Sequence, residues 1–227
     1  MIKNITSALL LSALIPASFA GTMGATNERP VDLHPWSAIG SLGYTAYQNS
    51  YGDNGQTALG RFAIGKDLFN FGAGNARFNM LNKVNSNFGL EVGVQSGNRM
   101  PIAISETDMT TLGGLPIWTT VQPMLDALAT LKVASVANDK FFGIVKGGLA
   151  YRRWQMDRDT VNNLYQIAGE AQAGVGMSIS QSATLSLLYQ GVYGANPNFS
   201  VNSIALTGHV SNIPVQNGAL LSLSMTL

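Results

Sequence analysis

Residues 87–95 read Asn-Phe-Gly-Leu-Glu-Val-Gly-Val-Gln. The even-numbered positions of this stretch are apolar, and the odd-numbered positions are small, polar or charged. Successive side chains of a β-strand point to opposite faces, so the stretch predicts a strand with one apolar and one polar face. In a soluble sheet the apolar face would lie on a core. In a membrane barrel it faces lipid, and the polar face lines the interior.

The same alternation recurs along most of the chain. It predicts strands at residues 36–47, 57–66, 87–95, 121–133, 141–151, 165–177, 184–193 and 219–227. Long and short connections alternate, although residues 67–83 are too apolar for a simple turn and could extend both neighbouring strands. This arrangement predicts an all-β fold, a transmembrane antiparallel up-and-down β-barrel of eight strands.

Some segments leave alternatives open. Residues 124–136 are rich in Ala and Leu, so a helix that begins after Pro123 is the alternative to a strand there. The connections 48–56, 96–119, 153–164 and 194–215 are predicted to be loops. A soluble lipocalin-like barrel is a further alternative, and it would place polar faces outside and an apolar interior within.

The chain begins like a secretory precursor. Lys3 precedes an apolar run at residues 8–15, and small residues at Ser18 and Ala20 predict cleavage after Ala20. The alternative is an N-terminal membrane anchor, but the apolar run is about half the length of a spanning helix. We therefore expect a signal peptide at 1–20, a periplasmic tail at 21–34 and a barrel at 35–227, located in a bacterial outer membrane.

Composition narrows the function classes. Charged residues make up 11% of the chain and the net charge is +1, which argues against nucleic acid as a partner. There is no Cys, so disulfides, thiol chemistry and a lipoprotein anchor are excluded. Gly is abundant, with 25 residues, and it falls inside alternating runs as well as in turns, as expected for tightly curved strands.

Aromatic residues lie near the ends of the predicted strands, where a membrane-interface belt would need them. They are Trp36, Tyr47, Phe141, Tyr151 and Tyr193. Arg99 and Lys83, also near strand ends, are candidates for contact with anionic lipid headgroups.

Four stretches carry a family resemblance: the leader, residues 141–152, residues 169–176 and the ending 212–227. They resemble the small outer-membrane barrels of Gram-negative bacteria. They are similar to the OmpA-like transmembrane-domain superfamily, including the versions found in Legionella and its relatives. The resemblance implies outer-membrane lipid and lipopolysaccharide as surroundings. It also implies recognition of the C-terminal strand by the barrel-assembly machinery, without a peptidoglycan-binding domain. The chain departs from the pattern at Leu227, where such barrels usually end in Phe or Trp.

Seven charged residues fall on the polar face of their predicted strands, according to the alternation of faces. They are Arg61, Glu91, Asp126, Lys132, Lys146, Arg152 and Glu170. Side chains fill the interior of an eight-stranded barrel, and charges buried there must be paired. We therefore predict a salt-bridge network that fills the lumen, with a gate or narrow ion path of a small porin-like channel as the alternative.

Catalysis has little support in the sequence. His34 lies in the tail, whereas His209 and Ser211 lie in an outer loop, so a lipid hydrolase is a weak alternative. Asp157 and Asp159 are flanked by Arg153 and Arg158, which predicts a solvated charged loop. No zinc, phosphate-loop or calcium-loop spacing occurs, so we expect no metal, no cofactor and no enzymatic activity. The long outer loops favour a structural or adhesin-like role with a surface partner.

Overall fold

The computed structural model describes residues 35–48, 55–71, 84–96, 99–102, 117–121, 124–135, 138–156, 163–194, 198–202, 207–211 and 215–227. Every regular element in these ranges is a β-strand. The strands are β1 (Trp36–Gln48), β2 (Gly55–Phe71), β3 (Val84–Gln95), β4 (Arg99–Ile102), β5 (Ile117–Val121), β6 (Met124–Ser135), β7 (Asn138–Met156), β8 (Leu164–Ser178), β9 (Ala183–Gly194), β10 (Asn198–Asn202), β11 (Thr207–Ser211) and β12 (Val215–Thr226). The leader and tail predicted at residues 1–34 lie outside the described residues.

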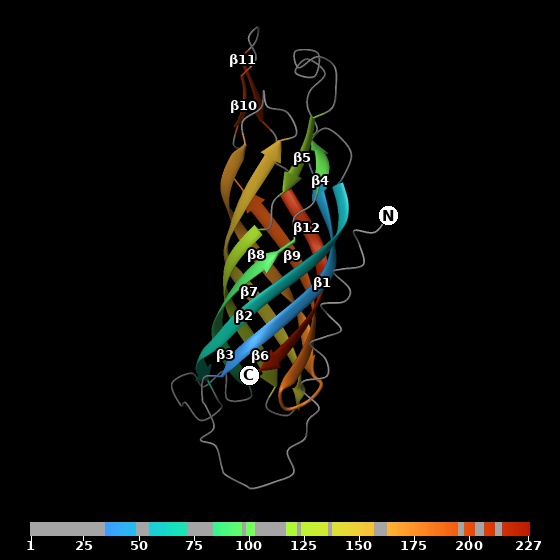
Figure 1. Ribbon diagram of the computed structural model, residues 1–227. Helices are drawn as coiled ribbons and strands as arrows, with labels where there is room; N and C mark the ends of the chain where they lie inside the picture. Colours follow the sequence, from blue (N-terminus) through green and yellow to red (C-terminus); the bar gives the residue numbers. More distant parts are fainter. Residues whose placement is uncertain are drawn as a thin grey trace. The chain divides into compact units, whose positions relative to one another are not determined.

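Eight of these strands close into an antiparallel barrel, as the sequence predicted. Around the wall the order is β1, β2, β3, β6, β7, β8, β9 and β12, and β12 pairs with β1 to complete the circle (Figure 1). Residues 124–135 form a strand, so the helix alternative for this segment is wrong. In the described part of the chain no helix is long and apolar enough to cross a membrane.

The pairing is staggered around the barrel. Starting at Leu59 of β2 and stepping from partner to partner through every strand returns the path to β2 at Asn70. One residue of this offset is the bulge between Asp67 and Phe69, where the register of β2 against β3 shifts. Closure therefore requires tilted strands, and residues far apart in sequence reach the same level of the lumen.

Strands β4 and β5 show that the loop predicted at 96–119 is partly wrong. Gln95 pairs with Met124 and Arg99 pairs with Thr120, so β4 and β5 continue β3 and β6 in the same register. Strand β5 lies between β4 and the end of β7, and it pairs with both. Strand β7 extends to Met156 instead of ending at Tyr151. Pro101 suggested a loop, but β4 lies at the edge of this sheet, where a missing N–H is tolerated.

Two other predicted boundaries need correction. Residues 194–215, predicted as a loop, contain the separate hairpin β10–β11. Strand β2 continues to Phe71, so the ambiguous segment does extend it; residues 72–83 lie outside the described ranges. The short connection between the strands predicted at 165–177 and 184–193 is a tight turn, in which Ile179 donates its N–H to the carbonyl of Ala183 at 2.9 Å. In Figure 1 this turn end carries the C-terminus, and β10–β11 lie at the opposite, loop end.

The two faces of the wall differ as the alternation predicted. Large apolar side chains on the outer face are exposed, including Leu42, Phe62, Ile64, Leu90, Val92, Leu125, Val145, Leu149, Ile167, Val175, Leu187 and Leu221. Polar and charged side chains are buried inside, among them Ser41, Thr45, Gln95 and Ser222. A soluble lipocalin-like barrel requires the reverse, so the structure contradicts that alternative.

Glycine on the inner face permits close approach of neighbouring strands. A Cβ atom added to Gly148 of β7 would overlap the backbone carbonyl of Ala127 on β6. Its neighbour Gly147 points outward, and a Cβ atom there would meet nothing within 4 Å. The curvature of the wall at β6 and β7 thus depends on Gly148 and not on Gly147.

We predict that Gly148→Ala lowers the free energy of unfolding by about 1–3 kcal/mol, because the backbone must shift to accept the methyl group. Gly147→Ala is the matched control and should change it by less than about 0.5 kcal/mol. Urea titration of the two refolded variants measures both values. Equal effects at the two positions would contradict this account of the wall.

Candidate functional site

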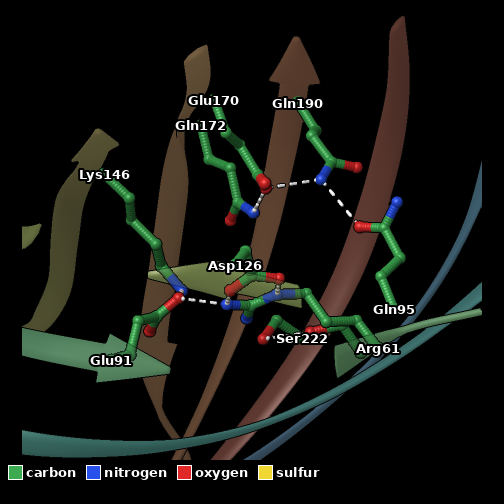
Figure 2. Close-up of polar contacts among 10 residues, drawn as sticks. Arg61, Glu91, Gln95, Asp126, Lys146, Glu170, Gln172, Gln190 and Ser222 are labelled. Atoms are coloured by element: carbon green, nitrogen blue, oxygen red, sulfur yellow. Dashed lines mark hydrogen bonds and ion pairs between the residues drawn. The ribbon is translucent and has the colours of Figure 1, made fainter. Parts of the chain in front are cut away.

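Four charged side chains from four strands meet in the lumen. Arg61 of β2 donates from Nε to Asp126 of β6 at 2.8 Å, and its Nη2 bonds both Asp126 and Glu91 of β3. Lys146 of β7 donates from Nζ to both oxygens of Glu91, at 2.9 Å each. Figure 2 shows the guanidinium between the two carboxylates, with Lys146 on the far side of Glu91. We call these four residues the ion cluster.

Gly93 leaves the room that the ion cluster occupies. It lies on the inner face of β3, opposite Ala63 of β2 and Asp126 of β6. A Cβ atom at Gly93 would lie 2.8 Å from Nη2 of Arg61 and 2.9 Å from Oδ1 of Asp126. A larger residue here would therefore displace the bond between Arg61 and Asp126.

A second group, the amide cluster, adjoins the ion cluster. It consists of Glu170 and Gln172 on β8, Gln190 on β9 and Gln95 on β3. Gln172 and Gln190 donate from Nε2 to Oε1 of Glu170 at 2.7 and 2.6 Å. Gln190 also donates to Oε1 of Gln95 at 2.8 Å, so hydrogen bonds cross the lumen from β8 to β3 (Figure 2).

The remaining two predicted lumen charges lie apart from these clusters. Arg152 is buried, and its guanidinium carbon lies 5.2 Å from the centre of the Trp154 ring. Lys132 is only half-buried, towards the turn end. Among the described residues the buried charges are thus three basic (Arg61, Lys146, Arg152) and three acidic (Glu91, Asp126, Glu170). Their formal charges cancel, which limits the cost of burial.

The lumen is filled differently on the two sides of the ion cluster. Met124, Ala150, Ala168 and Val192 pack together as a buried apolar group in the loop-side halves of their strands. Towards the turn end lie two cavities that share Lys132 and Thr184 as lining residues. A second buried apolar group, formed by Leu59, Phe142, Ile144, Leu188 and Leu220, adjoins these cavities, so the turn side is partly packed and partly open.

Sequence reasoning placed the charges on the inner face but did not identify the amides as part of the site. Gln95, Gln172 and Gln190 share the parity of the charged residues, and all three are buried. Their place in the alternation, on the same face as the charged residues, could have identified them. A long polar side chain on the inner face of a narrow barrel must find a hydrogen-bond partner there.

The predicted interfacial aromatics with described side chains lie on the outer face. Trp36, Phe141, Tyr151 and Tyr193 are exposed, whereas the side chain of Tyr47 lies outside the described part. Trp36 and Phe141 lie near the turn end, and Lys66 is 4.9 Å from the Trp36 ring centre. Near the loop end Tyr151 stacks with Tyr165, with ring centres 6.2 Å apart.

The residues considered for chemistry do not form a described site. His209 and Ser211 lie on β11 of the separate hairpin, and their side chains are outside the described part. His34, Lys83, Asp157, Arg158 and Asp159 also lie outside it, and of Arg99 only the backbone is described. Arg153 belongs to β7, and its guanidinium lies over the ring of Tyr165 at 5.4 Å. No group of three His, Cys, Asp or Glu residues among those described could hold a metal ion.

The fold resembles solved outer-membrane barrels. Neisserial surface protein A aligns with a TM-score of 0.52 and 10% identity, over 85% of this chain and 97% of that one. The N-terminal β-barrel domain of Pseudomonas aeruginosa OprF aligns with a TM-score of 0.44 and 11% identity, covering 85% and 98%. Ail, the attachment invasion locus protein of Yersinia pestis, gives 0.43 and 9%, covering 85% and 99%. At 10% identity, the likeness to Neisserial surface protein A concerns the fold alone. No protein-family model and no curated protein sequence matches the chain.

We predict that Arg61→Met lowers the free energy of unfolding by about 3–5 kcal/mol, because Asp126 would keep a buried charge without its partner. The double variant Arg61→Met with Asp126→Leu should be the more stable of the two, since it leaves Glu91 paired with Lys146 and no charge alone. Urea titration in lipid vesicles measures both. A double variant destabilised by the sum of the two single changes would contradict this coupling.

Proposed function

We propose that this protein is an integral outer-membrane β-barrel whose lumen is closed by charged side chains, and that it acts as a structural or surface-interaction protein. Two observations support the location: the exposed apolar band on the outer face and the likeness in fold to Neisserial surface protein A. A closed barrel also satisfies every wall hydrogen bond within itself, which lipid demands.

The observation that carries the proposal is the ion cluster. Arg61, Glu91, Asp126 and Lys146 link four strands across the lumen, and their side chains are 0–3% exposed. A passage occupied by paired side chains offers no continuous water path. The extended hairpin β4–β5 and the separate hairpin β10–β11 at the loop end would then provide the surface for an outside partner.

The same proposal includes the surroundings of the barrel. Outer-membrane lipid and lipopolysaccharide would contact the apolar band. The barrel-assembly machinery would bind the C-terminal strand β12, which ends next to the exposed Leu227. We assign no nucleic-acid partner and no enzymatic role. The lipid-hydrolase alternative depends on His209 and Ser211 alone, both in the short strand β11.

One observation favours the porin-like alternative. The cavities at the turn end bring open space up to Lys146 and Glu91, so only part of the barrel length separates this space from the loop end. Rearrangement of the ion cluster would then be enough to extend the passage.

We expect the wild-type protein to show no steady conductance in a planar lipid bilayer. The double variant Arg61→Ser with Asp126→Ser should give open events, because it removes two large side chains from the middle of the lumen and leaves the charge balanced. The control variant Ser41→Ala with Ser222→Ala removes only a hydroxyl pair that is hydrogen-bonded at 2.9 Å, and it should stay silent.

Each outcome of the conductance measurement decides between the functions. Steady wild-type conductance would favour the small channel over the closed barrel. If the wild type and both variants are all silent, the apolar group around Met124 and Val192 closes the lumen, and the ion cluster is not the plug.

The outer face provides a test of the membrane location. We predict that Val92→Arg, in the middle of β3, lowers the free energy of unfolding in phospholipid vesicles by about 2–4 kcal/mol, because the charge would face hydrocarbon. Ile179→Arg is the control, since Ile179 is equally apolar and exposed but lies in the turn between β8 and β9. Urea titration of both variants measures the difference, and equal small effects would argue against a lipid-facing wall.

A further inference from the structure

We propose that the lumen holds a binding site for a small oxyanion of the size of inorganic phosphate, entered from the turn end. The site is the smaller of the two turn-end cavities, which we call the inner cavity. The inference goes beyond the proposed surface role and does not depend on whether the barrel conducts.

The inner cavity is accessible but small. Its volume is about 30 Å³, roughly the space of two waters or one small ion. The larger cavity, of about 360 Å³, lies beside it and shares Lys132 and Thr184 with it. Lys132 thus lies at the junction, where a solute entering from the turn end must pass it.

Among the charged side chains of the inner cavity, Lys132 is the one left without a partner. The charged residues on the inner side of this lining are Lys132, Lys146, Asp67 and Glu91, because Lys66 lies against the Trp36 ring on the outer face. Glu91 is paired with Arg61 and Lys146, and Asp67 accepts a hydrogen bond from the amide of Asn87 at 2.8 Å. Within the described part of the chain Lys132 has neither an ion pair nor a hydrogen bond.

A second donor lies next to Lys132. Thr130 is two residues away on β6, so both side chains share the inner face, and its register partner on β7 is Lys146. Thr130 is 8% exposed, and its hydroxyl oxygen has no hydrogen-bond partner among the described residues. A buried hydroxyl in this state costs free energy, which a bound oxyanion would recover by accepting its hydrogen.

The rest of the lining suits an oxygen-rich ligand. Ser37, Thr184, Ser186, Ser222 and Ser224 contribute hydroxyl groups around the same space. Each hydroxyl can donate one hydrogen bond to an oxyanion, and the apolar side chains of Ile39, Ile144 and Leu188 complete the lining. A compact oxyanion therefore fits the inner cavity better than an apolar molecule does.

The test is a titration of the isotope-labelled protein in detergent micelles with inorganic phosphate, followed by NMR. Chloride keeps the ionic strength constant, and the signals of Thr130 and Ser186 report on the site. We expect their shifts to saturate. Lys132→Gln should weaken the affinity about tenfold or more, because it removes the positive charge, and Thr130→Val should weaken it severalfold, because it removes a hydroxyl donor.

The matched control is Lys140→Gln, which removes the same charge from an exposed position near the start of β7. It should leave the affinity unchanged within about twofold, because exposed charges are screened by salt. Shifts that do not saturate, or equal losses in Lys132→Gln and Lys140→Gln, would mean general charge attraction and would overturn the site. An affinity that is unchanged in Lys132→Gln would overturn it as well.

An independent measurement uses the absence of native cysteine. Ser224→Cys places a thiol on the lining of the inner cavity, and its reaction rate is compared for anionic and cationic methanethiosulfonate reagents. The anionic reagent should react faster, and this preference should fall when Lys132→Gln is added. Equal rates for both reagents would contradict an anion-attracting cavity.

Discussion

The stagger with which eight strands close on themselves determines what the interior of this protein can hold. A path from Leu59 through the eight strands returns at Asn70, and this offset decides which inward side chains share a level of the lumen. Arg61, Glu91 and Asp126 meet through the registers of the neighbouring strands β2, β3 and β6, although Arg61 is 30 residues from Glu91 and 65 from Asp126 in sequence. The composition of the interior follows from the alternation, and its pairing follows from the stagger.

Burial then requires the interior to be electrically balanced. A narrow barrel excludes the water that would otherwise solvate an ion, so each buried charge needs a partner of opposite sign or several hydrogen bonds. Arg61 and Lys146 both bind Glu91, whereas Glu170 is held by the amides of Gln172 and Gln190. Gly93 contributes by its lack of a side chain, since the space beside it is where Arg61 reaches Asp126.

Much of the fold was predictable from the sequence, because alternation assigns each strand residue to a face once one register is known. The eight-stranded barrel and its outward apolar band follow from stretches such as residues 87–95. The pairing of Arg61 with Asp126 does not, because it depends on the register of β2 against β3 and of β3 against β6, which alternation alone does not determine. Pro101 led to the prediction of a loop where the chain continues from β3 into β4. Proline indicates a loop unless its strand is known to lie at the edge of a sheet. Lys132 shares the parity of the ion cluster, yet its level in the barrel separates it from that cluster.

The pairing of β3 with β6 continues in the same register as the pairing of β4 with β5, and this has a mechanical consequence. Strand β7 contains 19 residues, whereas a strand needs about 9–11 to cross a bilayer. The end of β7 pairs with β5, and β5 pairs with β4, so these strands form a ribbon held by its own ladder of hydrogen bonds; in the proposed membrane setting it would stand beyond the lipid. Such a ribbon is already ordered before anything binds. Docking of a molecule on it would therefore cost less conformational entropy than docking on a loop that must first become ordered.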